Sequence, residues 1–324
     1  MSSAPSICDK FMSRAAEIAA RGLGRTRPNP AVGAVVVRDG VVVGEGWHRR
    51  AGGDHAEVAA IKDAVRNGAG SLSGAEMFVT LEPCSKPGRV GACTDAIAAA
   101  GISRVIYAMP DPNPVNRGGA ARALARAGVR CERFRGDKAV SDAARDLVRG
   151  FAKRMRTGLP FVTVKIAMSL DGRTHDRHGD SKWISGERAR ALTSGRLRNR
   201  FDAIMVGAET VRRDNPSLLA RGRRHDGLLR VVVSRSGNLP SGAKVFTDGR
   251  NKTTVCRDAK EAVELLGREG MNEVLCEGGM KLAVSLAELG LVDEWIAVLA
   301  PKIIGERRVS DAIVMENVKC LQDW

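Results

Sequence analysis

Apolar residues in the first half of the chain recur in turn at helical and at strand spacing. Near the N-terminus, Phe11, Ala15, Ile18 and Ala19 share one face of an expected helix. Two apolar runs, at 31–38 and 41–47, flank Asp39-Gly40, a dipeptide typical of hairpin turns. Alternating elements then follow: helices at 57–67, 94–100 and 119–127, and strands at 76–81, 103–109 and 129–134. This alternation predicts a three-layer α/β domain.

A break in the pattern near residue 150 separates a second domain. The segment 141–156 predicts a helix, and Thr157-Gly158-Leu159-Pro160 ends it. An apolar strand at 161–168 follows, and a later strand at 272–276 leads into another helix. We therefore divide the chain into domains 1–150 and 151–324, both of α/β type.

Composition favours a cytoplasmic enzyme. The 324 residues, 44% of them apolar, can supply two hydrophobic cores. Apolar runs fall short of the roughly 18 residues that a membrane span needs, and Met1-Ser2-Ser3-Ala4-Pro5 lacks a signal-peptide pattern. Seven widely spaced cysteines, an odd number, do not form the disulfide framework of a secreted domain.

The net charge of +15 raises the question of nucleic-acid binding. The basic excess is spread over both domains without a tail or block, and aromatic residues make up only 4% of the chain. Little material is therefore present for a base-stacking platform. We expect no nucleic-acid partner and no membrane, and we expect the charge to attract phosphorylated small molecules.

The first domain contains three potential metal ligands whose types and order along the chain indicate a zinc site. His55 and Glu57 open the helix after a Gly-Gly loop, Cys84 follows a strand, and Cys93 begins another helix. One imidazole and two thiolates make a three-ligand zinc site, which leaves a fourth position for water. Because Glu57 is not a ligand, it can move protons for that water, as deamination requires. The helix start should stabilise the Cys93 thiolate.

Longer motifs occur in both domains. In the first domain they are Thr26-Arg27-Pro28-Asn29-Pro30-Ala31-Val32-Gly33, Gly44-Glu45-Gly46-Trp47-His48, His55-Ala56-Glu57-Val58 and Thr80-Leu81-Glu82-Pro83-Cys84-Ser85. In the second they are Lys165-Ile166-Ala167-Met168-Ser169-Leu170-Asp171-Gly172-Arg173, Trp183-Ile184-Ser185-Gly186, Asp214-Asn215-Pro216 and Glu277-Gly278-Gly279. With these motifs the chain resembles a known family, the bifunctional pyrimidine deaminase and uracil reductase of riboflavin biosynthesis.

The resemblance implies a fold and two cofactors. It implies an N-terminal cytidine-deaminase-like α/β/α domain with one zinc ion, and a C-terminal dihydrofolate-reductase-like α/β domain that binds NADPH. Relative to the family, this second domain is expected to be short at its C-terminal end. A phosphorylated pyrimidine is the implied substrate, and a homo-oligomer is expected.

The resemblance also implies further site residues. In the deaminase, Asn29 and His48 would contact the substrate. In the reductase, which has no Gly-x-Gly-x-x-Gly motif, Gly279-Met280-Lys281 would hold the cofactor phosphates at a helix N-terminus. The other implied cofactor positions are Ala167, Trp183, Thr210 and Asp214, and the implied substrate positions are Ser181, Arg198, Leu218, Arg221 and Glu277. Arg198 and Arg221 suit a ribose phosphate because guanidinium groups bind phosphate through paired N–H donors.

Other interpretations stay open on the sequence alone. A deaminase of free or tRNA bases would use the zinc motif and the charge, but it would leave the second domain without a function. A non-enzymatic binding module would use the zinc as a structural clip, although Glu57 and the open ligand position count against it. In a mixed case, only one of the two domains would be active.

Overall fold

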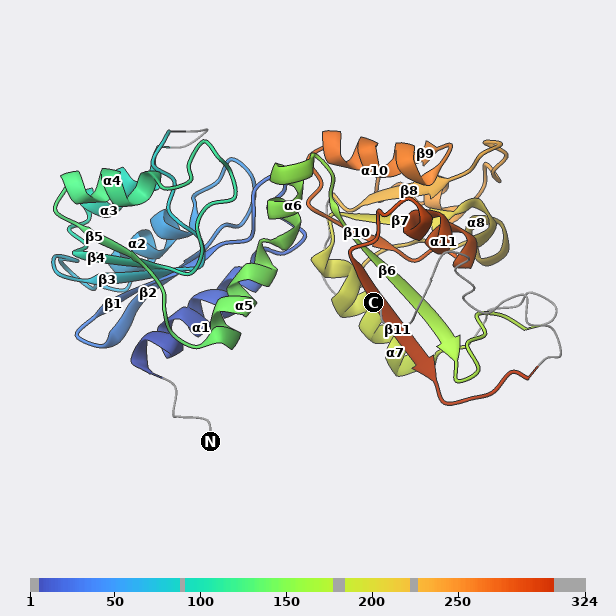
Figure 1. Ribbon diagram of the computed structural model, residues 1–324, viewed down its shortest axis with the longest axis horizontal. Coiled ribbons are helices and arrows are strands. Elements are labelled where there is room, and N and C mark those ends of the chain that lie inside the picture. The colour runs from blue at the N-terminus through green and yellow to red at the C-terminus, as the bar shows by residue number, and fades with distance from the viewer. Residues whose placement is uncertain (1–5, 88–90, 177–183, 222–226, 306–324) are drawn as a thin grey trace. The chain divides into compact units, whose positions relative to one another are not determined.

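The computed structural model describes residues 6–87, 91–176, 184–221 and 227–305 (Figure 1). The chain forms two compact units that divide between Gly158 and Leu159, later than residue 150. The helix expected at 141–156 is in fact two helices, α5 (Lys138–Leu147) and α6 (Arg149–Thr157). Val148 between them leaves the helical conformation, with φ −115° and ψ 6°, so the prediction of one continuous helix was wrong.

The first unit is built on a five-stranded sheet of order β2-β1-β3-β4-β5. Strand β1 is antiparallel to β2 and β3, whereas β3, β4 and β5 are parallel. Asp39 and Gly40, both with positive φ, form the predicted hairpin turn between β1 and β2. The strands are β1 (Gly33–Arg38), β2 (Val41–Trp47), β3 (Glu76–Val79), β4 (Arg104–Tyr107) and β5 (Arg130–Arg133).

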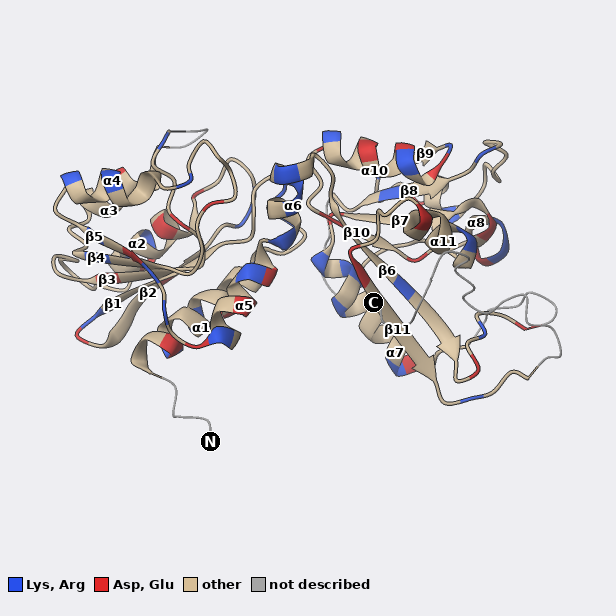
Figure 2. Cartoon of the chain, viewed as in Figure 1, with Lys and Arg blue, Asp and Glu red and all other residues tan. Residues whose placement is uncertain are grey.

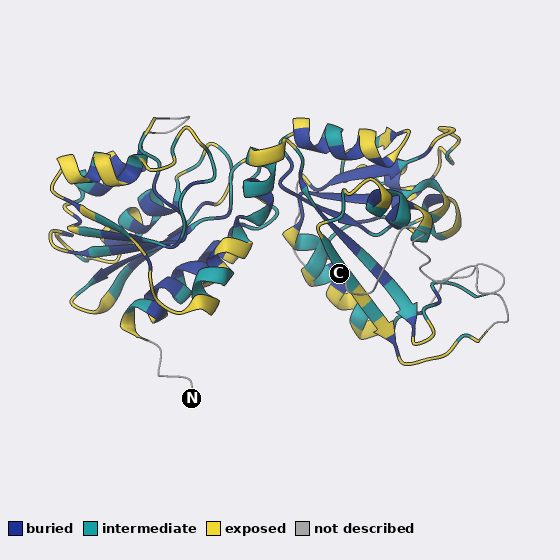
Figure 3. Ribbon diagram, viewed as in Figure 1, coloured by how far each residue is buried: buried dark blue, intermediate teal, exposed yellow. Residues whose placement is uncertain are grey.

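Helices cover both faces of this sheet, which confirms the three-layer prediction (Figure 3). Successive side chains of a strand point to opposite faces of the sheet. Val35 and Phe78 therefore pack in one apolar cluster, and Ala34 and Met77 pack in the other. The first cluster contains α1 and α5, and the second contains α2, α3 and α4. The helix bounds are α1 (Ile7–Ala19), α2 (Ala56–Arg66), α3 (Cys93–Ala99) and α4 (Gly119–Arg126), and the 3-10 turn η1 (Ala20–Gly22) follows α1.

Close packing on strand β2 places the start of α2. A Cβ atom on Gly46 would lie only 2.2 Å from the Ala60 nitrogen and 2.4 Å from the Ala56 carbonyl oxygen. Only glycine therefore lets the helix backbone approach the strand this closely. The contact fixes the first turn of α2, which carries His55 as its N-cap and Glu57.

The second unit contains a six-stranded parallel sheet of order β11-β6-β10-β7-β8-β9. Its strands are β6 (Phe161–Ser169), β7 (Ala203–Gly207), β8 (Leu229–Val233), β9 (Thr253–Cys256), β10 (Glu273–Cys276) and β11 (Glu294–Ala300). Its helical segments are α7 (Glu187–Leu192), η2 (Thr193–Leu197), η3 (Arg198–Arg200), α8 (Ala208–Asp214), α9 (Lys244–Thr247), α10 (Ala259–Arg268) and α11 (Met280–Glu288).

Each face of the second sheet has its own apolar cluster. Helices α10 and α11 pack on one face through residues such as Leu266 and Leu286. Helices α8 and α9 cover the other face with Val211 and Val245. Within the described ranges, no helix is both long and apolar enough to cross a membrane. Basic and acidic residues are interspersed on the elements of each unit (Figure 2).

Candidate functional site

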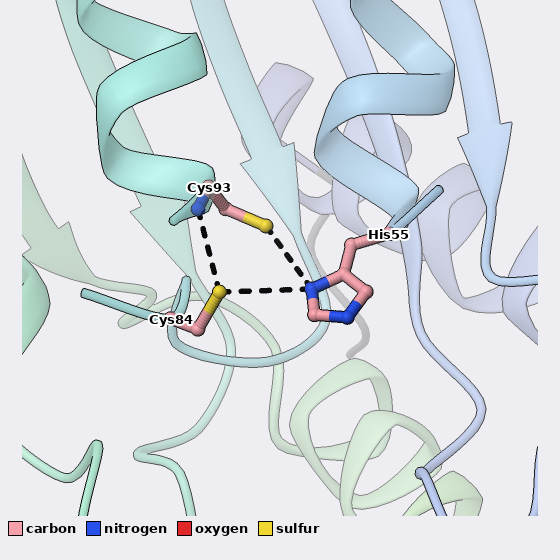
Figure 4. A group of neighbouring side chains, drawn as sticks. All are labelled: His55, Cys84 and Cys93. Carbon is pink, nitrogen blue, oxygen red and sulfur yellow. Dashed lines mark hydrogen bonds between the residues drawn. The ribbon is translucent and has the colours of Figure 1, made fainter. Parts of the chain in front are cut away.

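Three segments of the first unit bring His55, Cys84 and Cys93 together (Figure 4). His55 caps α2, Cys84 lies in the loop after β3, and Cys93 is the first residue of α3. Their ligand atoms lie within 4.8 Å of one another. His55 Nδ1 is 3.2 Å from the Cys93 sulfur and 3.6 Å from the Cys84 sulfur. This donor set of one imidazole and two thiols fits zinc.

The two thiols have different acidities. The pKa of Cys84 is lowered to about 4, chiefly by its side-chain hydrogen bond with Cys93. The backbone N–H of Cys93 also donates to the Cys84 sulfur over 3.3 Å. The pKa of Cys93 is raised because its proton is held against Cys84 and because its side chain is buried. The start of α3 therefore stabilises the Cys84 thiolate through the Cys93 backbone N–H. The expectation that it also favours an anionic Cys93 stays a prediction.

Glu57 lies in the first turn of α2, with only 4% of its surface exposed. Burial raises the pKa of its carboxyl to about 7, and the nearby Cys84 thiolate adds to the rise. The carboxyl interacts with Cys93, so it lies beside the ligand cluster. A carboxyl group with a pKa near neutrality can both accept and return a proton.

His48 and Asn29, both expected to contact substrate, contact each other. His48 is 2% exposed, and its Nδ1 lies 2.9 Å from the Asp54 carbonyl oxygen, which can only accept a hydrogen bond. Nδ1 therefore carries the proton, and Nε2 accepts from the Asn29 amide over 3.0 Å. Burial lowers the pKa of His48, which agrees with a neutral ring. The ring also packs edge-on against His55, with centroids 5.2 Å apart.

A cavity of about 1600 Å³ occupies the second unit. It gathers residues from β6, α8, the loop after α8 and the start of α11. The residues predicted from the sequence that line it are Ala167, Arg198, Thr210, Asp214, Leu218, Arg221, Glu277 and Gly279. Met280 and Lys281 follow Gly279 in the first turn of α11. Ser181 and Trp183 lie outside the described residues.

An ion pair stands inside this cavity. Arg198 donates to both carboxylate oxygens of Glu277, over 2.7 and 3.0 Å, and also to the Leu219 carbonyl oxygen over 2.9 Å. Both side chains are mostly buried, at 16% and 11% exposed. The guanidinium group is thus engaged with Glu277, and its expected contact with the substrate stays a prediction.

The sequence reasoning missed one titratable residue beside this pair. Lys165, on β6, lines the cavity next to Ala167. Burial lowers its pKa, Glu277 partly offsets this effect, and Arg198 adds to it. Alternation along β6 could have indicated a side chain facing the site, since Lys165 and Ala167 are two residues apart.

The loop after α8 has two residues with positive φ at the cavity. Asn215, with φ 43°, is the C-cap of α8, a position where asparagine readily adopts the left-handed conformation. Leu218 has φ 54°, which a leucine rarely adopts. The Asn215 side chain accepts from the Lys244 backbone N–H over 2.8 Å, and Leu218 is buried against the α8–α9 cluster. Packing therefore holds this part of the cavity wall in a conformation that the isolated loop would not favour.

Comparison with known proteins covers both units. Residues 5–109 match the model for the cytidine and deoxycytidylate deaminase zinc-binding region, and residues 160–322 match the RibD C-terminal domain. The chain is 36% identical to the riboflavin biosynthesis protein RibD of Escherichia coli, covering 91% of this chain and 88% of that protein. It is 37% identical to RibD of Bacillus amyloliquefaciens, covering 97% and 90%.

Solved structures agree with these sequence matches. A Thermotoga maritima structure described as a diaminohydroxyphosphoribosylaminopyrimidine deaminase/5-amino-6-(5-phosphoribosylamino)uracil reductase superposes with a TM-score of 0.83. It is 33% identical in sequence, and the match covers 93% of this chain and 88% of that one. The match to Acinetobacter baumannii RibD has a TM-score of 0.82 at 34% identity, covering 95% and 91%.

Proposed function

Because this chain belongs to the RibD family of bifunctional deaminase/reductases in riboflavin biosynthesis, we propose that its two sites act on one phosphorylated pyrimidine in succession. The first unit would hydrolytically deaminate 2,5-diamino-6-(5-phosphoribosylamino)pyrimidin-4(3H)-one. The second would reduce the ribosyl group of the product to give 5-amino-6-(5-phosphoribitylamino)uracil. The name of the Thermotoga maritima relative pairs these same two activities.

In the deaminase, His55, Cys84 and Cys93 would hold one zinc ion, and Glu57 would move the protons. Bound zinc would supply the Lewis acidity that lets water act as a nucleophile near neutral pH. Glu57 would take a proton from the attacking water and return one to the departing amine, for which a pKa of about 7 is suited. His48 would hold the Asn29 amide in place, so that Asn29 can recognise an edge of the pyrimidine.

In the reductase, the cavity would hold the nicotinamide cofactor and the deaminated pyrimidine side by side. NADPH would supply the hydride, and the protein would supply alignment. Gly279, as the N-cap of α11, exposes backbone amides of the kind that bind phosphate. Reduction at the ribosyl carbon also consumes a proton. Lys165, which lines the cavity near the Arg198–Glu277 ion pair, would deliver it.

One observation supports the first step most directly. A buried carboxyl that is not a ligand lies beside a His/Cys/Cys set whose ligand atoms are within 4.8 Å. A closed structural zinc site would have a fourth protein ligand, whereas this group consists, among the described residues, of His55, Cys84 and Cys93. A base deaminase would account for this site but would leave the second cavity without a function.

A coupled assay tests the proposal. Zinc-loaded protein is given the diaminopyrimidinone ribosyl phosphate, and ammonia release and NADPH absorbance are followed together. We expect equal amounts of ammonia and oxidised NADPH, and the loss of both signals in Glu57→Ala because the second step is starved. Ammonia without NADPH oxidation would confine activity to the first unit, and the absence of both signals in the wild type would overturn the assignment.

The preference for NADPH over NADH, the homo-oligomer and a cytoplasmic location are further parts of the proposal. The family relationship supports a nicotinamide-dependent reductase. Steady-state rates with each dinucleotide would measure the preference, and sedimentation velocity of the purified chain would measure its oligomeric state.

A further inference from the structure

A second buried carboxylate, outside the chemistry described above, lies close to the zinc ligands. Glu82 is 3% exposed and stands two residues before Cys84, in the segment that leaves β3. Its side chain accepts three backbone hydrogen bonds. Oε2 accepts from Asp111 over 3.2 Å and from Gly118 over 3.1 Å, and Oε1 accepts from Ala120 over 3.3 Å.

These three donors belong to the two ends of one loop. Asp111 begins the segment between β4 and α4, and Gly118 and Ala120 end it at the first turn of α4. One carboxylate therefore ties both ends of the loop to the Cys84 segment. Hydrogen bonds to a charged acceptor are about twice as strong as those between neutral groups, so a buried carboxylate suits this task.

The interior of the same loop is held by Asp111. This buried carboxylate accepts from the Asn113 backbone N–H over 2.8 Å and from the Asn116 side-chain amide over 3.2 Å. Glu82 thus fixes the ends of the loop, and Asp111 fixes its shape. Together they make the 111–120 segment a rigid wall rather than a free connection.

This wall rests directly on the residue after the zinc ligand. A Cβ atom on Gly119 would lie 2.0 Å from the Ser85 hydroxyl oxygen and 3.1 Å from the Ser85 Cβ. The Ser85 side chain therefore occupies the space that a side chain at position 119 would need. A displacement of the 111–120 loop would change this contact with Ser85, the neighbour of Cys84.

We propose that Glu82 is a positioning residue of the deaminase site, which holds the 111–120 wall in place and thereby sets the position of the Cys84 sulfur. The proposal rests on the deaminase function proposed above. Groups that orient metal ligands without touching the metal commonly contribute a factor of roughly 10–100 to metal affinity or activity. Glu82 would act on Cys84 through the backbone rather than through a direct hydrogen bond.

Glu82→Gln tests this role, because it keeps the size of the side chain but turns an amide N–H toward a backbone donor. Zinc affinity is measured on the metal-free full-length chain by competition with a chromophoric chelator, a readout that does not depend on activity. We expect zinc affinity to fall at least about tenfold, and kcat of deamination to fall at saturating zinc. The rate of the reductase with the deaminated pyrimidine should match the wild type, which shows that the second unit is intact.

Glu132→Gln is the matched control. Glu132 is a partly exposed residue on β5 of the same sheet, where it pairs with Arg104. This variant loses an ion pair but touches neither the wall nor the ligands, so its zinc affinity should equal that of the wild type.

A second variant disturbs the wall without changing Glu82. Gly119→Ala would press the new Cβ against Ser85. We expect it to weaken zinc binding in the same direction, and Ser85→Ala added to it should restore part of the loss.

The outcomes separate this proposal from the function on which it rests. If the wild type does not deaminate the pyrimidine, the proposed function fails. If the wild type is active but Glu82→Gln binds zinc and deaminates equally well, the positioning role is wrong. It is also wrong if Glu82→Gln loses the reductase as well, since Glu82 would then support the fold at large. If the first unit of Glu82→Gln does not fold, unchanged zinc affinity in Gly119→Ala would overturn the role, and weakened affinity would support it.

Discussion

The two candidate sites are built on different scales. In the first unit, ligand atoms from three segments lie within 4.8 Å of one another. In the second unit, residues from 165 to 279 line a cavity of about 1600 Å³. The first arrangement suits a single ion, and the second suits a dinucleotide with a substrate beside it.

Because the two sites differ in size, we expect them to differ in how well they tolerate amino-acid substitutions. A metal site depends on a few donor atoms, so the loss of one atom removes a large share of its function. A broad cavity distributes binding over many contacts, and each contact contributes little unless it touches the reacting atoms. Substitutions should therefore have all-or-none effects in the first unit and graded effects in the second.

The largest effect is expected at Glu57. Glu57→Gln keeps the size of the buried side chain but cannot accept the proton, so deamination should fall by roughly 10²–10⁴-fold. Ammonia release under saturating substrate measures the loss. The reductase, given the deaminated pyrimidine directly, should keep its full rate. A deaminase rate within threefold of the wild type would remove Glu57 from the mechanism.

Most of the first site could be predicted from the sequence because short motifs carry it. His55 and Glu57 share one helix start, and Cys84 and Cys93 each follow a recognisable element boundary. The hydrogen bond from the Cys93 backbone N–H to the Cys84 sulfur could not be predicted in this way, because the direction of that N–H arises only from the folded loop.

The second site was less predictable because its contacts join distant parts of the chain. Arg198 and Glu277 are 79 residues apart, and their pairing follows from the placement of η3 beside the end of β10. Arg230 shows the same limit, since a charged residue in a strand gives no sign that it will be fully buried. The split of the expected helix at Val148 has no proline to mark it, and Gly150, two residues further on, lies within helix α6.

In the second unit, the largest expected effect is the loss of stability caused by a substitution of Arg230. It is 1% exposed and donates to the Asp248 carboxylate over 2.6 and 2.9 Å and to the Ser217 carbonyl oxygen over 2.9 Å. It also donates to the Asn251 carbonyl oxygen, so it ties together two segments that line the cavity. Arg230→Met should cost about 3–5 kcal/mol, because Asp248 loses its buried partner.

The cost is measured as the change in the free energy of unfolding in urea, with the loss of reductase activity as the signal for unfolding. Arg212→Met is the matched control in the same unit, since Arg212 is 38% exposed and pairs with Glu209 on the surface. It should change the free energy of unfolding by less than about 1 kcal/mol. If Arg230→Met and Arg212→Met lowered the free energy of unfolding by similar amounts, the buried Arg230–Asp248 ion pair would not have the importance assigned to it.

A smaller effect is expected at Glu277 itself. Glu277→Gln keeps a hydrogen bond to Arg198 but removes the charge beside Lys165. We expect kcat of the reductase to fall about 10–100-fold, while ammonia release continues at the wild-type rate. The same variant would then release ammonia faster than it oxidises NADPH. An unchanged reductase rate would show that Glu277 serves only to pack Arg198.

The smallest expected effect concerns the scaffold of the first unit. Asp9 is 7% exposed and accepts from the Ser6 hydroxyl over 2.6 Å and from the Asp137 backbone N–H over 2.7 Å. The Ser6 hydroxyl, with help from Asp137, lowers the pKa of Asp9 below its ordinary 3.8. Loss of a capping interaction of this kind typically costs about 1 kcal/mol, so Asp9→Asn should cost that much at pH 7.

The sign of the pH dependence follows from the lowered pKa. The ionised carboxylate stabilises the fold fully above the unfolded-state pKa near 3.8, and this contribution is lost as pH falls through the lower folded-state value. The difference in urea midpoint between wild type and Asp9→Asn should therefore be constant from pH 7 to 5 and shrink below pH 4. Asp142→Asn, at an exposed ion pair, should show no measurable difference at either end. A gap at Asp9 that widens in acid would contradict the assigned direction, because only a raised folded-state pKa gives that trend.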